Sequence, residues 1–202
     1  MISLEEVLIR RLGRLDYAAA LEAMRSFTAS RNEATPDELW LLAHPPVYTL
    51  GQGAGHPGVP NGIALIKSDR GGDITYHGPG QVVLYALVDL ARRGIQVKPF
   101  VALLEQAVID LLGGRGERRP GAPGVYVDGA KIAALGIRVR QGRSYHGLAL
   151  NVDMDLAPFH AIDPCGYPGL AVTQMRDLGM QHDPCVVGDR LARHFIERLE
   201  HA

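Results

Sequence analysis

Two cysteine thiols are the strongest nucleophiles in this sequence. Cys165 stands in the run DPCGYPG (163–169), between prolines and glycines, in a long stretch without periodic hydrophobicity. Structural cysteines usually lie among packed apolar residues, whereas long loops inside compact domains are usually functional or disordered. Cys185 is the rival, but it leads into Val186 and Val187 and has the surroundings of a packed residue. We therefore favour Cys165 as the reactive thiol and keep Cys185 as the alternative.

A thiol needs a neighbour that favours its thiolate, because only a small fraction is ionised at neutral pH. The candidates are His77, His146, His160 and Lys131. Lys131 stands out because it begins a run of small and apolar residues just after a turn. Burial among such residues would lower the pKa of a lysine toward a range useful for proton transfer. A solvated hairpin lysine is the alternative, and the sequence does not decide between the two.

The segment RGGDITYHGPGQ (70–81) carries a second concentration of chemical groups. It combines a guanidinium, an acid, a hydroxyl and an imidazole with four glycines, directly before an apolar run. Glycines let a ligand lie against backbone N–H groups. The alternative is a glycine-rich turn in which His77 is merely hydrogen-bonded. Composition alone leaves these two interpretations evenly matched.

Other familiar motifs are weak or absent. Residues 53–58 (GAGHPG) match GxGxxG, but Pro57 does not allow the helix that a dinucleotide site requires. The sequence contains no Walker, GxSxG or HExxH motif. His182 and Cys185 are three positions apart, which we interpret as an incidental pair rather than the edge of a zinc site.

These groups must be positioned by alternating strands and helices. Apolar residues at helical spacing predict helices, and an unbroken apolar run predicts a strand covered on both faces. Asp128-Gly129 between apolar runs predicts a hairpin, and Gln141-Gly142 predicts a second turn. We expect helices over 16–31, 99–112 and 189–200, loops over 47–60 and 153–173, and strands over 7–12, 38–43, 64–67, 81–88, 125–127, 131–139 and 145–152.

Length and composition bound the class of protein. The 202 residues suit one domain, 1–202, and 47% hydrophobic residues are typical of a globular chain. A net charge of -1 argues against general nucleic-acid binding. No apolar stretch is long enough for a membrane span, and charged residues interrupt the N-terminal region where a signal peptide would be apolar. We expect a cytoplasmic location, where two cysteines stay free thiols.

Taken together, the motifs resemble the lipoyl(octanoyl) transferase family, also called octanoyl-[acyl-carrier-protein]:protein N-octanoyltransferase. The resemblance rests on five segments in the family's order and runs from about residue 4 to 199. These segments are HPPVYTLG (44–51), RGGDITYHGPGQVVLY (70–85), AKIAALGIRV (130–139), HGLALNV (146–152) and the Pro-Cys-Gly turn at 164–166.

The resemblance implies an α/β chain with the biotin/lipoate protein ligase-like fold, a mixed β-sheet flanked by helices in a single domain. It makes Cys165 the acyl-thioester nucleophile and Lys131 the residue that lowers the pKa of Cys165. This sequence departs from the family pattern with Ala134 where serine is usual, Tyr126 where tryptophan is common and Ala130 where a basic residue is frequent. The implied substrate-binding residues are Arg70, Gly71, Gly72, Asp73, Ile74, Thr75, Tyr76, His77, Ala134, Leu135, Gly136, His146, Gly147, Leu148 and Ala149.

The implied enzyme transfers an octanoyl group from octanoyl-acyl carrier protein to a lysine of lipoyl domains, the first step of protein lipoylation in endogenous lipoate biosynthesis. The acceptors are the lipoyl domains of 2-oxoacid dehydrogenases and the glycine cleavage H protein. No cofactor or metal is expected, because the phosphopantetheine arm belongs to the donor, and neither nucleic acid nor membrane is an expected partner. An acidic carrier protein would dock on basic residues, for which the sequence offers Arg92, Arg93, Arg115, Arg118 and Arg119.

Three other activities remain as alternatives. An ATP-dependent lipoate or biotin ligase would share the fold but would not need Cys165. A catalytically silent module would bind carrier or lipoyl domains without becoming acylated. A cysteine hydrolase would release free octanoate.

Overall fold

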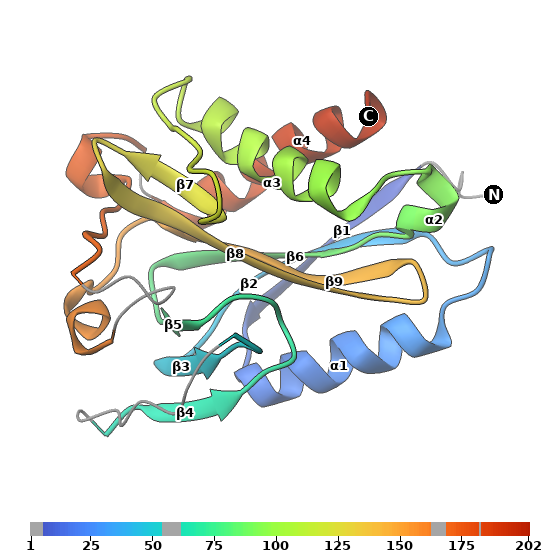
Figure 1. Cartoon of the computed structure of the whole chain (residues 1–202), viewed down its shortest axis with the longest axis horizontal. Helices are drawn as coiled ribbons and strands as arrows, with labels where there is room; N and C mark the ends of the chain where they lie inside the picture. The colour runs from blue at the N-terminus through green and yellow to red at the C-terminus, as the bar shows by residue number, and fades with distance from the viewer. Residues whose placement is uncertain (1–5, 54–61, 163–168, 182) are drawn as a thin grey trace.

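The computed structural model describes residues 6–53, 62–162, 169–181 and 183–202, and these form two mixed sheets (Figure 1). In the larger sheet β1 and β2 are parallel and the other neighbours are antiparallel. In the smaller sheet, β3 is parallel to β4 and antiparallel to β5. The larger sheet has the order β1 (Val7–Arg14), β2 (Asp37–Ala43), β6 (Gln81–Leu87), β9 (Arg143–Asn151), β8 (Ala130–Arg140) and β7 (Gly124–Val127); the smaller has the order β4 (Ala64–Lys67), β3 (Val47–Leu50) and β5 (Ile74–His77).

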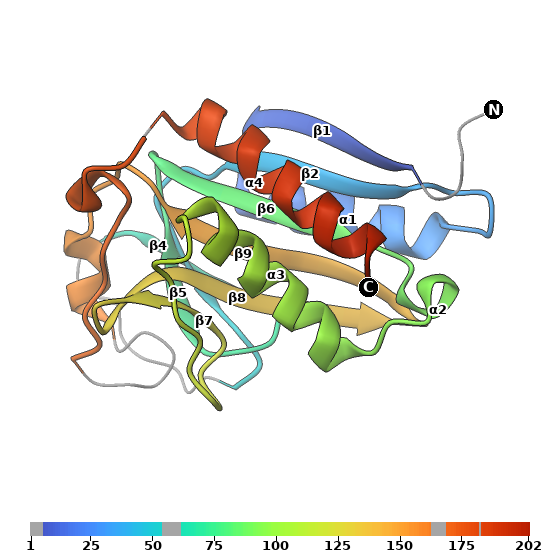
Figure 2. The ribbon, with the colours of Figure 1, turned by 90° about the horizontal axis from the view of Figure 1, so that it is seen from above.

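Helices cover both faces of the larger sheet. Figure 2 shows α3 (Val97–Leu111) and α4 (Pro184–Glu200) side by side on one face, and Figure 1 shows α1 (Tyr17–Ser30) and the smaller sheet on the other. Short helical turns complete the chain: α2 (Leu90–Arg93), η1 (Ala157–Ala161) and η3 (Arg176–Leu178). None of the helices in the described part of the chain has the length and apolar character needed to cross a membrane. The predicted mixed sheet flanked by helices is confirmed.

Strand β6 shows why an unbroken apolar run forms the centre of this fold. Val82, Leu84 and Ala86 pack in the core beneath α3 and α4. The alternate residues Val83 and Tyr85 pack on the α1 side. Successive side chains in a strand point to opposite faces, so a strand covered on both faces needs apolar residues at nearly every position.

The two predicted tight turns of the β7–β8–β9 meander are confirmed. Asp128 and Gly129 connect β7 to β8 with φ angles of 48° and 84°. Gln141 and Gly142 connect β8 to β9 with φ angles of 51° and 75°. Two successive positive φ values belong to the type I′ turn, whose twist suits a hairpin.

The structure departs from the local predictions at four places. Residues 47–50 form β3 rather than a loop, and residues 74–77, within the glycine-rich segment, form β5. Each is only four residues long, and β3 finds its partner through pairs such as Val47 with His77, which no local pattern reveals. Helix α4 begins at Pro184, five residues earlier than predicted, because the Asp183 side chain accepts a hydrogen bond from Cys185 N (2.9 Å). Cys185 therefore lies exposed in the first helical turn and is not a packed residue.

A buried carboxylate joins the end of α1, the start of β2 and the turn into α2 at one end of the larger sheet. Asp37, 0% exposed, pairs with Arg31 (2.5 Å, also 0% exposed), Arg92 (2.7 Å) and Arg93 (2.6 Å). Burial alone would raise the pKa of Asp37, but hydrogen bonds from Asp89 N and from these arginines hold that pKa below its ordinary value. Arg92 and Arg93 are thus held by Asp37 while remaining partly exposed, and their part in a docking face stays a prediction.

We expect Asp37→Ala to lower the free energy of unfolding by about 3–5 kcal/mol, because it leaves the buried Arg31 guanidinium without its partner. The measurement is urea unfolding followed by circular dichroism. The control is Asp189→Ala, which removes an exposed partner of Arg11 and should cost less than about 1 kcal/mol. Equal losses in the two variants would contradict a special role for the buried cluster.

Candidate active site

A narrow cavity lies between the α1 face of the larger sheet and the smaller sheet. Its floor consists of two rows of residues, and each row runs from β8 across β9 to β6 through paired positions. Four of these six positions are alanine or glycine, so the floor forms a trough instead of a packed interface. The first row is Ala134, Ala149 and Val83; the second row is Gly136, Gly147 and Tyr85.

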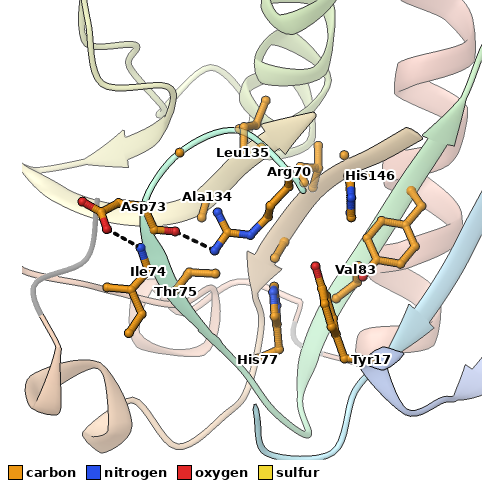
Figure 3. Close-up of a pocket in the computed structure, with 16 residues that line it drawn as sticks. Tyr17, Arg70, Asp73, Ile74, Thr75, His77, Val83, Ala134, Leu135 and His146 are labelled. Atoms are coloured by element: carbon orange, nitrogen blue, oxygen red, sulfur yellow. Dashed lines mark hydrogen bonds between the residues drawn. The ribbon is translucent and has the colours of Figure 1, made fainter. Parts of the chain in front are cut away.

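The roof of the trough is residues 70–75, and Arg70 holds it in place. Its buried guanidinium donates to Thr49 O (2.7 Å) and Thr49 Oγ1 (2.9 Å) on β3. It also donates to Asp73 O (2.7 Å) and Gly71 O (2.9 Å) within the loop itself. Figure 3 shows the guanidinium in the middle of the roof, with its bond to Asp73. These contacts fix the loop, so Arg70 shapes the cavity as well as lining it.

The roof rests directly on the backbone of β8. Gly71 N donates to Ile137 O (3.0 Å). A Cβ atom on Gly136 would lie 2.6 Å from Gly71 O, closer than a backbone atom can approach. Glycine at position 136 therefore permits the contact that closes the trough.

The structure gathers nearly all predicted binding residues around this one cavity. Of the fifteen, only Gly71 and Tyr76 do not line it. Gly71 faces a neighbouring cavity, and Tyr76 packs against Tyr48 and Phe159 in the core of the smaller sheet. The lining residues among those predicted are Arg70, Gly72, Asp73, Ile74, Thr75, His77, Ala134, Leu135, Gly136, His146, Gly147, Leu148 and Ala149.

The cavity is also lined by Tyr17, Val83 and Tyr85, which the sequence did not single out as binding residues. Tyr17 belongs to the apolar face of α1, and the other two belong to the apolar run of β6. Residues that line an apolar cavity have the same chemical character as residues that fill a core. No signal in the sequence separates these three from their packed neighbours.

A β-bulge turns Lys131 toward the cavity side of the sheet. Val125 on β7 pairs with Ala133 on β8, but the next residue, Tyr126, pairs with Lys131, so Ile132 is an extra residue. Lys131 and Ala134 are three positions apart, and in a regular strand they would point to opposite faces. Because of the bulge, both line one small cavity. The Lys131 side chain is buried, with Nζ donating to Pro123 O (3.3 Å). The alternative of a solvated hairpin lysine is wrong.

The small cavity at Lys131 adjoins the β8 end of the trough. Thr75 and Ala134 line both. The remaining residues that line the small cavity come from four other elements and loops, and they are Gln81, Asn151, Phe159 and Val172. A group bound in the trough would therefore have one end beside Lys131.

Cys165 lies outside the described residues, but the chain on both sides of it meets Lys131. Before it, Phe159 on η1 lines the small cavity. After it, Ala171 O accepts a hydrogen bond from Lys131 N (2.8 Å), and Thr173 N donates to Lys131 O (3.0 Å). Both described flanks of the cysteine segment therefore lie at the predicted lysine. His160, another candidate helper, is exposed on η1.

A cluster of neutral imidazoles and phenols closes the β6 end of the trough. His44 Nδ1 is 2.6 Å from Leu15 O and must donate to it, so Nε2 accepts from Tyr85 Oη (2.7 Å). His77 Nδ1 lies 2.8 Å from Gln81 Oε1. Burial lowers the pKa of both imidazoles, that of His77 well below its ordinary value. The imidazoles therefore serve as uncharged parts of the wall.

His146 forms a separate pair with Asp69 at the edge of the trough. Its Nε2 is 2.8 Å from Asp69 Oδ1, and Tyr145 Oη donates to Asp69 Oδ2 (2.8 Å). Burial would raise the pKa of Asp69, but hydrogen bonds from His146, Tyr145 and Arg25 hold that pKa well below its usual range. Burial also lowers the pKa of His146, against the opposing influence of Asp69. Its Nδ1 is buried and has no hydrogen-bond partner among the described residues.

No group of three His, Cys, Asp or Glu side chains suited to a metal occurs within residues 6–53, 62–162, 169–181 and 183–202. His182, one half of the pair considered with Cys185, falls outside these ranges.

We expect the free energy of unfolding to fall as the pH drops below about 6.5, the pKa of histidine in an unfolded chain. The pKa values of His44, His77 and His146 are lowered in the folded protein, so below that pH the unfolded chain binds protons that the folded chain does not. Three such groups give a slope of up to about 4 kcal/mol per pH unit. Urea unfolding between pH 7.5 and 5.5 measures it. His77→Gln should reduce the slope and His201→Gln, at the exposed end of the chain, should not; equal slopes in these two variants would contradict the assignment.

Residues 16–196 match the model of the lipoyl protein ligase A/B catalytic domain. A solved lipoate-protein ligase A bound with ATP superposes with a TM-score of 0.75 at 18% identity, over 96% of this chain and 85% of that one. A biotin protein ligase from Aquifex aeolicus gives 0.61 at 12% identity, over 95% and 70%. These structures confirm the biotin/lipoate protein ligase-like fold that the motifs implied.

Closer similarity in sequence is found among bacterial enzymes. The chain is 62% identical to an octanoyltransferase of Azoarcus sp. (strain BH72), over 96% of this chain and 88% of that protein. It is 56% identical to an octanoyltransferase of Dechloromonas aromatica (strain RCB), over 95% and 96%. The chain therefore belongs to the octanoyltransferase family, within the lipoyl protein ligase A/B catalytic domain family.

Proposed function

We propose that this protein is a transferase that moves an octanoyl group from octanoyl-acyl carrier protein to a lysine of a lipoyl domain, through a thioester on Cys165. One observation carries the proposal: a buried lysine stands where an apolar trough meets the described flanks of the cysteine segment. The family and the name of its members support octanoyl as the group transferred. The absence of a cofactor, and a cytoplasmic location with the acyl carrier protein, belong to the same proposal.

In the first half-reaction the thioester of the donor enters beside Lys131. Lys131 takes the proton of Cys165 Sγ and holds the resulting thiolate as its ion pair, and the thiolate attacks the thioester carbonyl. Pro123 O accepts from Lys131 Nζ and so orients it. The carbon–sulfur bond of the donor breaks, and the phosphopantetheine thiol leaves with the proton from Lys131. Cys165 then carries the octanoyl group.

The oxyanion of this step needs backbone donors close to Lys131. Gly71 N–H already donates to Ile137 O, so it does not serve. Gly72 and Asp73 line the trough, and both also lie on a neighbouring cavity that Pro123 lines. We assign the N–H groups of Gly72 and Asp73 to the oxyanion.

In the second half-reaction the neutral ε-amine of the acceptor lysine attacks the acyl-enzyme. An amide bond forms, the bond to Cys165 Sγ breaks, and the proton lost by the amine returns to the thiolate through Lys131. An amide is more stable than a thioester, so the transfer needs no ATP. The acceptors we propose are the lipoyl domains of 2-oxoacid dehydrogenases and the glycine cleavage H protein.

We expect octanoyl-acyl carrier protein, without ATP, to add one octanoyl group to the protein in intact-mass spectra. Hydroxylamine should remove it, because a thioester is cleaved by that nucleophile. Cys165→Ser should abolish the adduct, and Cys185→Ser, at the exposed second thiol, should leave it unchanged. An adduct that persists in Cys165→Ser, or no adduct on the wild type, would sink the proposal.

The same sample separates the alternative activities. Added apo lipoyl domain should gain the octanoyl mass while the enzyme loses it. A cysteine hydrolase would release free octanoate instead, a silent module would never become acylated, and a ligase would acylate the acceptor only from free octanoate and ATP.

We expect Lys131→Ala to slow acylation of Cys165 by about 10²–10⁴-fold, the usual contribution of general acid–base catalysis. The pH profile of iodoacetamide alkylation should also shift upward for Cys165. Lys131→Arg keeps the charge but cannot release a proton, so it should acylate as slowly as Lys131→Ala. Lys67→Ala, at an exposed position on β4, is the control. An unchanged alkylation profile in Lys131→Ala would show that the role assigned to Lys131 is wrong.

A further inference from the structure

The trough has one end at Lys131 and a closed end at β6. Its first row runs from Ala134 on β8 across Ala149 on β9 to Val83 on β6. Beyond Val83 the next position across the sheet is Leu42 on β2, which packs in the same core cluster. Tyr17 and His77 line the cavity at this end (Figure 3), and their rings stack with centroids 5.9 Å apart and planes 12° from parallel. A chain that entered beside Lys131 would therefore stop at Val83.

The length of this path matches a short acyl chain. Neighbouring strands lie about 4.8 Å apart, so the two steps from β8 to β6 cover about 10 Å. Bonds of about 1.5 Å in zigzag give an extended eight-carbon chain a span of about 9 Å. The cavity has a volume of about 40 Å³, whereas one water needs roughly 10–15 Å³. A cavity of this volume that extends over about 10 Å is a channel scarcely wider than a single acyl chain.

The closed end is held rigidly. Tyr17 Oη and Ser68 Oγ are 2.6 Å apart, and Tyr85 donates to His44 Nε2 (2.7 Å). Val83 is 1% exposed and packs in the same core cluster as the two tyrosines. A longer chain could enter only by breaking buried hydrogen bonds, which is costly.

We infer that Val83 is the residue that sets the length of the acyl chain, acting as a stop for the terminal methyl group. This inference rests on the proposed function, because it takes the thioester carbonyl to lie at the Lys131 end. Ala149, halfway along the floor, leaves the path open only because its side chain is one methyl group.

Two substitutions should shift the preferred length in opposite directions. Val83→Ala removes two methyl groups at the stop and should favour longer chains. Ala149→Leu fills the middle of the trough and should favour shorter ones. One methylene in an apolar pocket changes discrimination by about tenfold or more.

The experiment offers each enzyme an equimolar mixture of butyryl-, hexanoyl-, octanoyl-, decanoyl- and dodecanoyl-acyl carrier protein and reads the adducts on Cys165 by intact mass. For Val83→Ala we expect the decanoyl-to-octanoyl ratio to rise about tenfold or more over wild type. For Ala149→Leu we expect the ratio of octanoyl to the two shorter chains to fall about tenfold or more. Ratios within one sample do not depend on the fraction of folded enzyme.

Val82→Ala is the matched control, because it makes the same change at the neighbouring position on the opposite face of β6. Its ratios should equal those of the wild type. The inference is overturned if the decanoyl-to-octanoyl ratio is unchanged in Val83→Ala, or if it changes equally in Val82→Ala. In either case an octanoyl adduct on the wild type leaves the proposed function standing. No adduct of any length on wild type would instead overturn the proposed function.

Discussion

The site depends on one close approach of two backbones. Gly71 N bonds to Ile137 O on β8 (3.0 Å), and Gly136 has no Cβ atom to keep Gly71 O away. Arg70 anchors the same loop to Thr49 on β3. The glycine-rich segment thus bridges the two sheets, and the space that it encloses with the small residues of β8 and β9 is the trough. With a side chain at position 136, roof and floor could not meet in this way.

Many polar side chains surround the trough, yet it suits an apolar chain. The guanidinium of Arg70 is occupied by carbonyl and hydroxyl oxygens of its own scaffold. Asp69 is held by His146, Tyr145 and Arg25. Buried polar groups that are paired with each other stabilise the wall without demanding water or a charged ligand. The floor itself offers mainly alanine, glycine and valine to a bound group.

Relatives of the same fold that bind ATP show why the fold alone does not fix the chemistry. Lipoate-protein ligase A shares the architecture at 18% identity. In this chain a bulge brings Lys131 to the cavity side, and residues 171 and 173 bond to the two sides of its backbone. These contacts bring the described flanks of the cysteine segment to Lys131. A covalent route through Cys165 is the chemistry that such an attachment favours.

The sequence by itself determined the class of fold, the central strands, the hairpin turns and the identity of nearly every residue around the cavity. It could do so because hydrophobic period, Asp-Gly and Gln-Gly turns and family motifs are local properties. It did not reveal β3 and β5, since four-residue strands exist only through a partner far along the chain. It did not reveal that Arg92 and Arg93 bond to Asp37, because that carboxylate lies more than fifty positions away in the chain.

Only the tertiary structure decided which side of the sheet Lys131 faces, because one extra residue in β8 reverses the alternation that the sequence would suggest. Only the register across three strands placed Val83 opposite Ala149 and Ala134 and made it the end of a path. A sequence specifies which residues are apolar. Whether an apolar residue fills a core or ends a channel depends on the size of its neighbours across the sheet, which the chain acquires when its strands pair.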